Sequence, residues 1–242
     1  MSLREMINRN EILHGLKDLV TPLWIAINGR TGQDYWMSVI RKEGAHPVNN
    51  VVDVGAAHGY FLKKSWPHFG GAHFFHFEPR PDAAVSLKRL AEKLGTASQI
   101  FEMALDENAS TAKFAIMNYG DSSSLLVSTK GVPRSMAITR EIEVTVERLD
   151  TALALTGIEE IGLLKIDVEG VEKRVLLGGP DTLAKCFTVI LEISPARHVG
   201  GYIETLEVFE IMFKAGFSLV DTVNCDYLFT KDEGVLAHFH AK

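Results

Sequence analysis

The sequence predicts an α/β fold, in which a mostly parallel sheet carries helices on both faces and follows an N-terminal helical segment. Two observations support this prediction. From residue 48 onward, short apolar segments alternate with amphipathic segments at helical spacing, as in strand–helix–strand units with right-handed crossovers. Segments such as "LLKID" (163–167) and "TVILEI" (188–193) are mainly continuous apolar runs, as expected of central strands that are covered on both faces.

Residues 1–47 form the N-terminal segment, which we expect to be helical and to cap the main domain. Apolar residues repeat at helical spacing in "MINRNEILHGLKDLV" (6–20), and this spacing predicts one buried face. Pro22 and Pro47 interrupt the helical pattern. A dimer contact or a wall of a substrate site are alternative roles for the segment, and its aromatic residues fit either packing or a substrate wall: Trp24, Tyr35 and Trp36.

The main domain is expected over residues 48–242. We expect strands at 51–54, 73–77, 100–105, 162–166 and 187–193, and helices at 60–65, 82–94, 171–177 and 202–215. The last of these helices carries an apolar stripe and is followed by Gly216, a natural stop. Two further strands in "FSLVDTVNCDYLFTK" (217–231), joined by a turn at Asn224, are expected to close the sheet.

One stretch departs from this rhythm. The segments "AKFAIMN" (112–118) and "REIEVTVERLD" (140–150) alternate apolar and polar residues, with Ile142, Val144 and Val146 on one face. Such alternation predicts strands with one solvent-exposed face. Between them, a segment rich in Ser, Gly and Pro (119–139) predicts a long loop, which in compact domains often serves binding. Within it, "DSSSL" (121–125) fits either a polyol contact or a plain turn.

Composition narrows the function classes. The 242 residues include 25 basic and 31 acidic side chains, giving a net charge of −6, which disfavours nucleic acid or an anionic membrane as the main partner. The two cysteines, Cys186 and Cys225, form no CxxC pair, so we expect free thiols and neither a disulfide framework nor a cysteine zinc site. A signal-peptide pattern and a bilayer-length apolar run are both lacking, so we expect a soluble, cytoplasmic protein.

The segment "VVDVGAAHGYF" (51–61) runs from an apolar strand into a glycine-containing turn. It matches neither the GxGxxG pattern of dinucleotide sites nor the GxxxxGK[ST] pattern of phosphate loops. Asp53 would repel a pyrophosphate and attract a cationic group, and Glu78, at the tip of the next strand, could hold both hydroxyls of a ribose. The third strand ends in "FEMALDE" (101–107), which could border a purine. These features together suit S-adenosylmethionine, which is cationic and carries no phosphate.

Together with "KIDVEGVE" (165–172) and "LLGG" (176–179), these motifs resemble the FkbM family of S-adenosylmethionine-dependent methyltransferases, from about residue 49 to about residue 230. The resemblance implies a class I methyltransferase fold, a Rossmann-like seven-stranded sheet whose last strand is antiparallel. It also implies S-adenosylmethionine as the cofactor. The implied reaction is methylation of a hydroxyl, commonly on a sugar or a secondary metabolite.

The resemblance implies a cofactor-binding set with three parts. The turn after the first strand surrounds the methionine moiety, the tip of the second strand holds the ribose, and the end of the third strand borders the adenine. In that order, the predicted residues are Asp53, Gly55, Ala56, Gly59 and Tyr60; Glu78 and Pro79; and Met103 and Ala104. His58 stands where the family often has a small polar residue, so no role is assigned to it.

Three residues are candidates for orienting and deprotonating the methyl acceptor: Asp167, Glu192 and His198. Asp167 could instead cap a following helix, and its neighbour Glu169 could border the site or pair with Lys173. Glu192 lies in an apolar run where a carboxylate is costly unless it has a partner, and His198 fits either a general base or a solvated loop residue. The spacing gives a metal site no direct support, and none is assigned.

Two rival functions remain open at this point. A nicotinamide-dependent oxidoreductase would use a similar sheet, but the missing GxGxxG pattern disfavours it. A non-catalytic module that binds the cofactor without turnover is disfavoured by the acids at 53, 78 and 167. For the methyltransferase, we expect a small-molecule or carbohydrate acceptor as the partner, with a homodimer as an open option.

Overall fold

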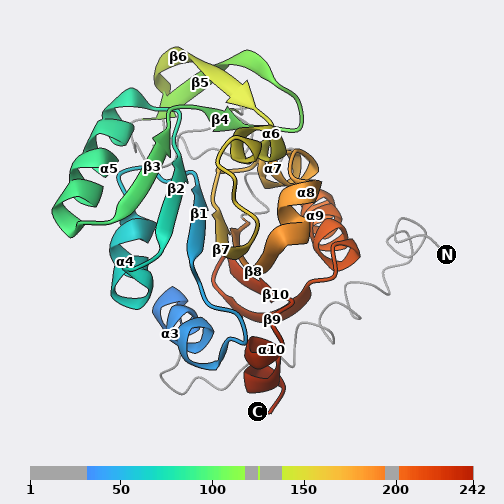
Figure 1. The fold of residues 1–242 in the computed structure, drawn as a ribbon. Coiled ribbons are helices and arrows are strands. Elements are labelled where there is room, and N and C mark those ends of the chain that lie inside the picture. The colour runs from blue at the N-terminus through green and yellow to red at the C-terminus, as the bar shows by residue number, and fades with distance from the viewer. Residues whose placement is uncertain (1–31, 118–124, 126–137, 194–201, 242) are drawn as a thin grey trace.

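The computed structural model describes residues 32–117, 125, 138–193 and 202–241, which form two sheets with flanking helices (Figure 1). The main sheet has seven strands in the order β3-β2-β1-β7-β8-β10-β9. Their bounds are β1 (Asn50–Val54), β2 (His73–Phe77), β3 (Ala97–Phe101), β7 (Ile161–Ile166), β8 (Cys186–Glu192), β9 (Ser218–Val223) and β10 (Asp226–Thr230). The predicted helical face within residues 6–20, most of the loop 119–139, Trp24 and His198 lie outside the described residues.

Strand direction in this sheet follows the prediction. β1 pairs in parallel with β2 and β7, β2 with β3, and β7 with β8. β10 is antiparallel to both of its neighbours, β8 and β9. The predicted turn between the last two strands is present, with Asn224 at a φ of 57°, a left-handed conformation that asparagine tolerates better than most residues. A mostly parallel seven-stranded sheet with an antiparallel last strand is thereby confirmed.

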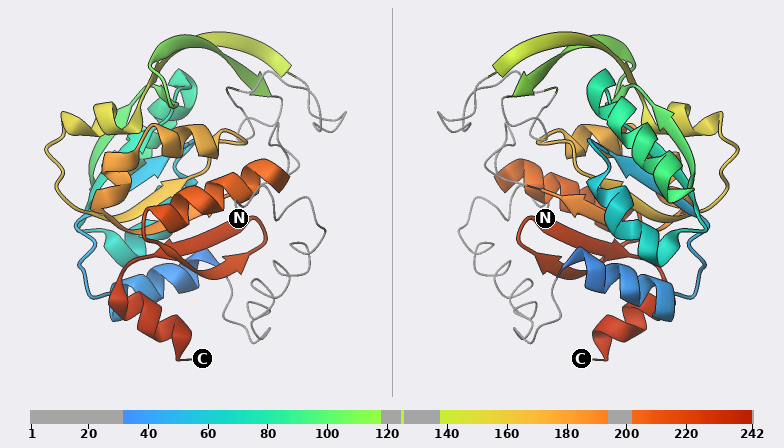
Figure 2. Two further views of the ribbon diagram at one scale, coloured as in Figure 1. Left: turned by 90° about the vertical axis from the view of Figure 1, so that its right-hand side faces the viewer. Right: turned by 90° about the vertical axis from the view of Figure 1, so that its left-hand side faces the viewer.

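Helices cover both faces of the main sheet, as Figure 2 shows. One face packs against α3 (Gln33–Glu43), α4 (Tyr60–Phe69), α5 (Pro81–Leu94) and α10 (Glu233–His240). The other packs against α6 (Leu149–Ala154), α7 (Glu172–Leu177), α8 (Pro180–Lys185) and α9 (Tyr202–Lys214). Residues of β1 alternate between these two layers: Val51 belongs to the first, and Val52 and Val54 to the second. This alternation decides which core each strand side chain enters.

A second, three-stranded sheet lies beyond one edge of the main sheet in Figure 1. It consists of β4 (Ala104–Leu105), β6 (Ile138–Glu147) and β5 (Ser110–Met117), in that order. In β6, Val144 and Val146 are buried, whereas Glu143 and Thr145, which alternate with them, are exposed. The alternating sequence of β6 therefore forms a strand with one wet face, as predicted, whereas in β5 the consecutive residues from Phe114 to Met117 are all buried and the same prediction is wrong there.

The prediction of one continuous strand over 100–105 is wrong. β3 ends at Phe101, and a turn in which Met103 N–H donates to the Phe101 carbonyl at 2.9 Å separates it from β4. Ala104 and Leu105 then pair with β6 of the second sheet. An apolar run cannot by itself reveal such a change of partner, because the pairing strand comes some forty residues later in the chain.

The part of the N-terminal segment that the structure describes is helical and packs on the main domain. α3 buries Trp36, Met37, Val39 and Ile40. The Trp36 indole donates a hydrogen bond to Asp221 Oδ2 of β9 at 2.7 Å. For Trp36, packing on the domain is therefore the role that the structure supports. α10, which lies beside α3, has no counterpart among the predicted helices, and neither do the short helices α6 and α8.

Both cysteines are free thiols, as predicted; Cys186 is buried, whereas Cys225, for which the sequence also predicts burial, is half-buried. Over the described part of the chain, no helix combines the length and the apolar character that crossing a membrane requires.

Candidate functional site

A cavity opens at the carboxyl ends of β1, β2 and β7, the edge of a parallel sheet where ligands bind in open α/β folds. Its open space is about 510 Å³, counting the part that is continuous with solvent. Val54, Phe77, Leu105 and Phe114 give part of its wall an apolar character. Of the residues from the predicted cofactor set, five line this cavity: Gly55, Glu78, Pro79, Met103 and Ala104.

Gly55 forms the turn at the end of β1. Its φ of 81° lies in the left-handed region, and a Cβ at this position would stand 1.8 Å from the carbonyl oxygen of Asp167. Only glycine permits this close approach of two loops. Hydrogen bonds from the backbone N–H groups of Gly55 and Ala56 to the Phe77 carbonyl, at 3.0 and 3.1 Å, tie the same turn to β2.

Glu78 places a buried carboxylate in the cavity wall. Its Oε2 accepts a hydrogen bond from Ala57 N–H at 2.8 Å, and its Oε1 accepts from the backbone N–H and Nε of Arg80 at 2.9 and 3.2 Å. Burial raises the pKa of Glu78 and outweighs these hydrogen bonds and the Arg80 charge, which lower it. A carboxylate has about four lone-pair positions, so Glu78 retains acceptor capacity toward the cavity.

Ala57, whose N–H contacts Glu78, has a φ of 46°. This left-handed conformation is uncommon for a residue with a Cβ and is costly, and such strain concentrates at functional sites. Here the conformation has a visible consequence: it aims the backbone N–H at the Glu78 carboxylate.

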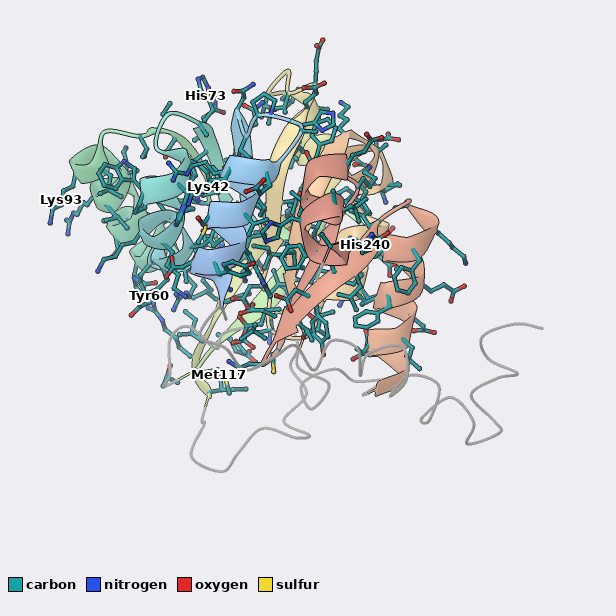
Figure 3. All side chains as sticks on the ribbon, turned by 90° about the horizontal axis from the view of Figure 1, so that it is seen from below. Lys42, Tyr60, His73, Lys93, Met117 and His240 are labelled. Carbon is teal, nitrogen blue, oxygen red and sulfur yellow. The ribbon has the colours of Figure 1, made fainter. Side chains whose placement is uncertain are left out.

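The other four predicted cofactor residues do not line the described cavity. Asp53 is buried in the opposite layer, where its Oδ2 lies 3.0 Å from Nδ1 of His76. Ala56 is buried behind the turn, and Gly59 packs so closely on α5 that a Cβ would stand 2.7 Å from Leu90 Cδ2. Tyr60 points outward with 65% of its surface exposed (Figure 3).

A cluster of charged side chains stands beside the cavity at the ends of β7, β8 and β10. Lys165 Nζ lies 3.0 Å from Asp167 Oδ2 and 3.9 Å from Glu192 Oε2. Asp226, the first residue of β10, pairs in register with Glu192, the last residue of β8. Asp167 also lines the cavity, so the structure brings two of the three predicted catalytic residues together. The third, His198, lies outside the described residues.

Burial and neighbouring charges shift the pKa values of several groups in this cluster. Burial and the neighbouring Asp167 raise the pKa of Glu192 to about 8, despite the opposing charge of Lys165. Burial likewise raises the pKa of Asp226. Burial alone would lower the pKa of Lys165, but the charges of Asp167, Glu192 and Asp226 together raise it. At neutral pH, the cluster therefore holds a charged lysine and retains a proton among its carboxyl groups.

The structure gives Asp167 no helix-capping role. α7 begins at Glu172, and its N-cap residue is Val171. The loop between Asp167 and α7 is instead fastened by Glu172, whose Oε1 accepts hydrogen bonds from Gly170 N–H at 3.0 Å and Val168 N–H at 3.4 Å.

The sequence offers Lys173 as an ion-pair partner for Glu169. In the structure, Lys173 pairs with Glu207 of α9 at 2.8 Å. Glu169 itself lies in the cavity wall at a φ of 57°. Of the segment "DSSSL", the structure describes Leu125 alone, which also lines the cavity.

Sequence reasoning assigned no role to Lys165, Glu172 or Arg80, all of which are buried at the site. A signal was present for Lys165, because a lysine within an apolar strand requires partners. For Glu172 and Arg80, burial follows from loop conformations that have no simple periodicity, so no comparable signal existed.

The comparisons with known proteins agree with this geometry. A family model described as the methyltransferase FkbM domain matches residues 53–219, which is more than half of the chain. The 31-O-demethyl-FK506 methyltransferase FkbM of Streptomyces tacrolimicus is 29% identical over 160 residues, which cover 56% of this chain and 61% of that protein. The 2-O-methyltransferase NoeI of Sinorhizobium fredii (strain NBRC 101917 / NGR234) is 26% identical over 174 residues, covering 67% and 70%.

The match thus spans less than two thirds of the first of these relatives. Among solved structures, Aeropyrum pernix fibrillarin with natively bound S-adenosyl-L-methionine shows 11% identity and a TM-score of 0.44, over 81% of this chain and 73% of that one. The family match covers both the turn at Gly55 and the loop at Asp167, the two segments that meet at the cavity. The chain belongs to the FkbM family of methyltransferases.

Proposed function

We propose that this protein is an S-adenosylmethionine-dependent O-methyltransferase that acts on a hydroxyl of a sugar or secondary metabolite. One observation carries the proposal: a glycine turn, a buried carboxylate and a second, partly exposed carboxylate meet at one cavity on the carboxyl edge of the sheet. The relatives' names support the acceptor class, since one is a methyltransferase of 31-O-demethyl-FK506 and the other a 2-O-methyltransferase.

The cavity residues fit an adenosyl group. Glu78 would accept a hydrogen bond from a ribose hydroxyl at its remaining lone-pair position, while Met103, Leu105 and Phe77 would pack on the adenine. The turn at Gly55 would border the methionine moiety, as the family resemblance implies. Asp53 is proposed to act indirectly, by holding β1 against β2 through His76. The other predicted turn residues, Ala56, Gly59 and Tyr60, would shape the turn.

The acidic wall disfavours the oxidoreductase. Among the described residues that line the cavity, three are acidic and one, Arg80, is basic. The Arg80 guanidinium already pairs with Glu78. A pyrophosphate would meet carboxylates here, whereas a sulfonium and an amino group would be attracted.

The proposed transfer needs little from the protein beyond alignment and proton removal. The bound cofactor would supply an activated methyl group, with a neutral thioether as the leaving group. Asp167, in the cavity wall, would accept the proton of the acceptor hydroxyl as the new C–O bond forms, so charge and atoms balance. Glu192 would stand behind Asp167 as its hydrogen-bond partner, and His198 is kept as a candidate base in the adjoining segment.

Thermal unfolding with separate additions of S-adenosylhomocysteine, S-adenosylmethionine and NAD tests the cofactor. A ligand at 100 times its dissociation constant adds about 2.7 kcal/mol to the free energy of unfolding. We expect a rise in Tm with both adenosyl compounds and none with NAD. A rise with NAD alone would favour the oxidoreductase. Transfer of an isotope-labelled methyl group onto a panel of sugars and macrolide alcohols then separates an enzyme from a non-catalytic binding module.

Glu78→Gln tests the ribose contact. The substitution keeps the side chain's size but weakens hydrogen bonds that involve a charged group, each worth about 1.5–3 kcal/mol. We expect the affinity for S-adenosylhomocysteine, measured by calorimetry, to fall by roughly 10- to 100-fold, the equivalent of about 1.4 to 2.7 kcal/mol. The control is Glu143→Gln, an exposed acid on β6, which should bind normally. Equal affinity in both variants would remove Glu78 from the ribose site.

A further inference from the structure

A lysine lies where a parallel strand is otherwise entirely apolar. Lys165 belongs to β7, every residue of which is buried, and it retains only 3% of its surface exposed. Leu164 and Ile166 on either side are fully buried in the core. Burying an ammonium is expensive unless it is paired. An apolar side chain of similar length would meet the packing needs of this position without that cost, so the charge itself requires an explanation.

Three carboxyl groups surround this ammonium. Asp167 comes from the loop after β7, Glu192 from the end of β8, and Asp226 from the start of β10. The shortest contact, 3.0 Å, joins Lys165 Nζ to Asp167 Oδ2, and the contact to Glu192 Oε2 is 3.9 Å. Counted over the described residues, one positive charge against three acids leaves a surplus of negative charge, which favours retention of a proton by the cluster.

Among the described residues of the packed helices, Gln33 and Lys64 act on the cluster through Asp226. Its carboxylate accepts a hydrogen bond from Gln33 at the start of α3, and Lys64 of α4 contributes a favourable charge. On the neighbouring strand β1, Asp53 stands opposite Lys165 in register, but its carboxylate pairs with His76. Among the described residues, the charges that act on Glu192 are those of Asp167, Lys165 and Asp226.

Exposure distinguishes the lysine from its partners. The side chains of Asp167 and Glu192 are 31% and 38% exposed, whereas that of Lys165 is 4% exposed. The buried ammonium thus contacts the two carboxyl groups from inside the protein. The other side of each carboxyl group remains accessible to solvent. A lysine delivers such a point charge at the end of a slim apolar stem.

We propose that Lys165 is a positioning residue for methyl transfer: its buried ammonium, 3.0 Å from Asp167 and 3.9 Å from Glu192, holds the Asp167 carboxylate at the cavity wall with Glu192 beside it. Lys165 acts through these two acids and touches neither cofactor nor acceptor. The catalytic meaning rests on the proposed function. The electrostatic arrangement of Lys165 and the acids does not depend on the proposed function, so the arrangement and the function can be tested separately.

The test compares Lys165→Met with Lys165→Arg, using Lys173→Met as the control. Lys173 directly follows the motif at 165–172 but pairs with Glu207, away from the cluster. The carboxyl carbon of Glu192 is followed by ¹³C NMR over pH in glutamate-labelled protein, with Glu192→Gln to assign its signal. We expect a midpoint near 8 in the native protein, a rise of at least one pH unit in Lys165→Met, and little change in Lys165→Arg or Lys173→Met.

An unchanged titration midpoint of Glu192 in folded Lys165→Met would overturn the proposal. If Lys165→Met does not fold, Asp226→Asn tests the same arrangement from the opposite side. Removing that negative charge should lower the Glu192 midpoint, because Asp226 contributes to raising it. An unchanged midpoint in Asp226→Asn would likewise overturn the proposal.

Binding of S-adenosylhomocysteine separates this proposal from the proposed function. A shifted Glu192 midpoint, without any adenosyl ligand binding to the native protein, would support the arrangement and reject the methyltransferase. With an acceptor identified in the screen, kcat/KM of Lys165→Met should fall at least tenfold near pH 7, and its rising limb should move to higher pH. A fall of equal size at every pH would indicate a purely structural lysine and reject the positioning role.

Discussion

At the scale of single residues, the site depends on positions where backbone geometry leaves one choice. Gly55 is the strongest case, because its missing Cβ makes room for the Asp167 carbonyl oxygen. The turn that borders the cofactor cavity and the loop that carries the proposed proton acceptor are in direct contact at this point. A change at Gly55 is therefore a change in the spacing between the two halves of the site.

Gly55→Ala and Gly95→Ala separate this crowding from backbone strain. Both glycines have positive φ angles, 81° and 67°, but a Cβ at Gly95 would have no heavy atom within 4 Å. Left-handed strain alone costs about 1–2 kcal/mol, which we expect for Gly95→Ala in urea unfolding. Gly55→Ala should lose clearly more stability and also bind S-adenosylhomocysteine more weakly. Equal losses in the two variants would mean that the loop at Asp167 moves aside freely.

At the scale of elements, the carboxylate of Asp232 connects helix α10 with the segment that follows helix α3. Asp232 caps α10 by accepting hydrogen bonds from Gly234 and Val235 N–H at 2.9 and 3.0 Å. The same side chain accepts from Ala45 and His46 N–H, just beyond α3, at 2.8 and 2.9 Å. Four backbone donors that would otherwise lack a partner are satisfied together. Through α3, this carboxylate also secures the layer that carries Gln33.

Asp232→Asn should therefore destabilise the protein by about 2 kcal/mol, since it weakens a helix cap and two charge-assisted hydrogen bonds. Burial acts to raise the pKa of Asp232, but the backbone hydrogen bonds outweigh it and lower the pKa below 3.8. Its contribution is then complete above pH 3.8 and is lost as the pH falls through the folded-state pKa. Urea unfolding between pH 3 and 7 measures both effects, with exposed Asp181→Asn as the control. A difference that grows toward low pH would contradict the assignment.

At the scale of the whole molecule, the sheet order assembles the site. β1, β2 and β7 are neighbours although the third follows the second by more than eighty residues. Antiparallel β10 brings its first residue, Asp226, to the edge where β8 ends with Glu192. The surplus of carboxyl groups beside Lys165 is thus a product of topology, and it links the stability of the whole fold to pH.

This linkage predicts that stability falls as the pH rises toward 8. Glu192 has a folded-state pKa of about 8, above its ordinary value of 4.5. Between those values the folded state binds more protons than the unfolded state, so the free energy of unfolding decreases with pH. In urea unfolding from pH 5 to 9, Glu192→Gln should show a flatter pH dependence than the native protein. Parallel curves would show that Glu192 titrates normally in the fold.

Much of the fold follows from local pattern. The strands at 51–54 and 73–77, the helix at 82–94 and the turn at Asn224 are all readable, because periodicity and turn chemistry act over a few residues. The break between Phe101 and Ala104 and the helix α10 are not readable in this way. The break depends on β6, a partner strand that is distant in the sequence. Helix α10 begins after the N-cap residue Asp232, which also accepts a hydrogen bond from Ala45, a residue far from it in the sequence.

The same distinction between local pattern and distant partners applies to the site. By itself, the sequence determined the ends of the first two strands, the glycine turn and the acids, and with them a cofactor that is cationic and free of phosphate. Only the tertiary structure decided that Glu78 faces the cavity while Asp53 enters the core, and that Lys165 stands among three acids. The physical reason is that residue type and spacing are local properties, whereas burial, charge pairing and pKa depend on which strands lie side by side.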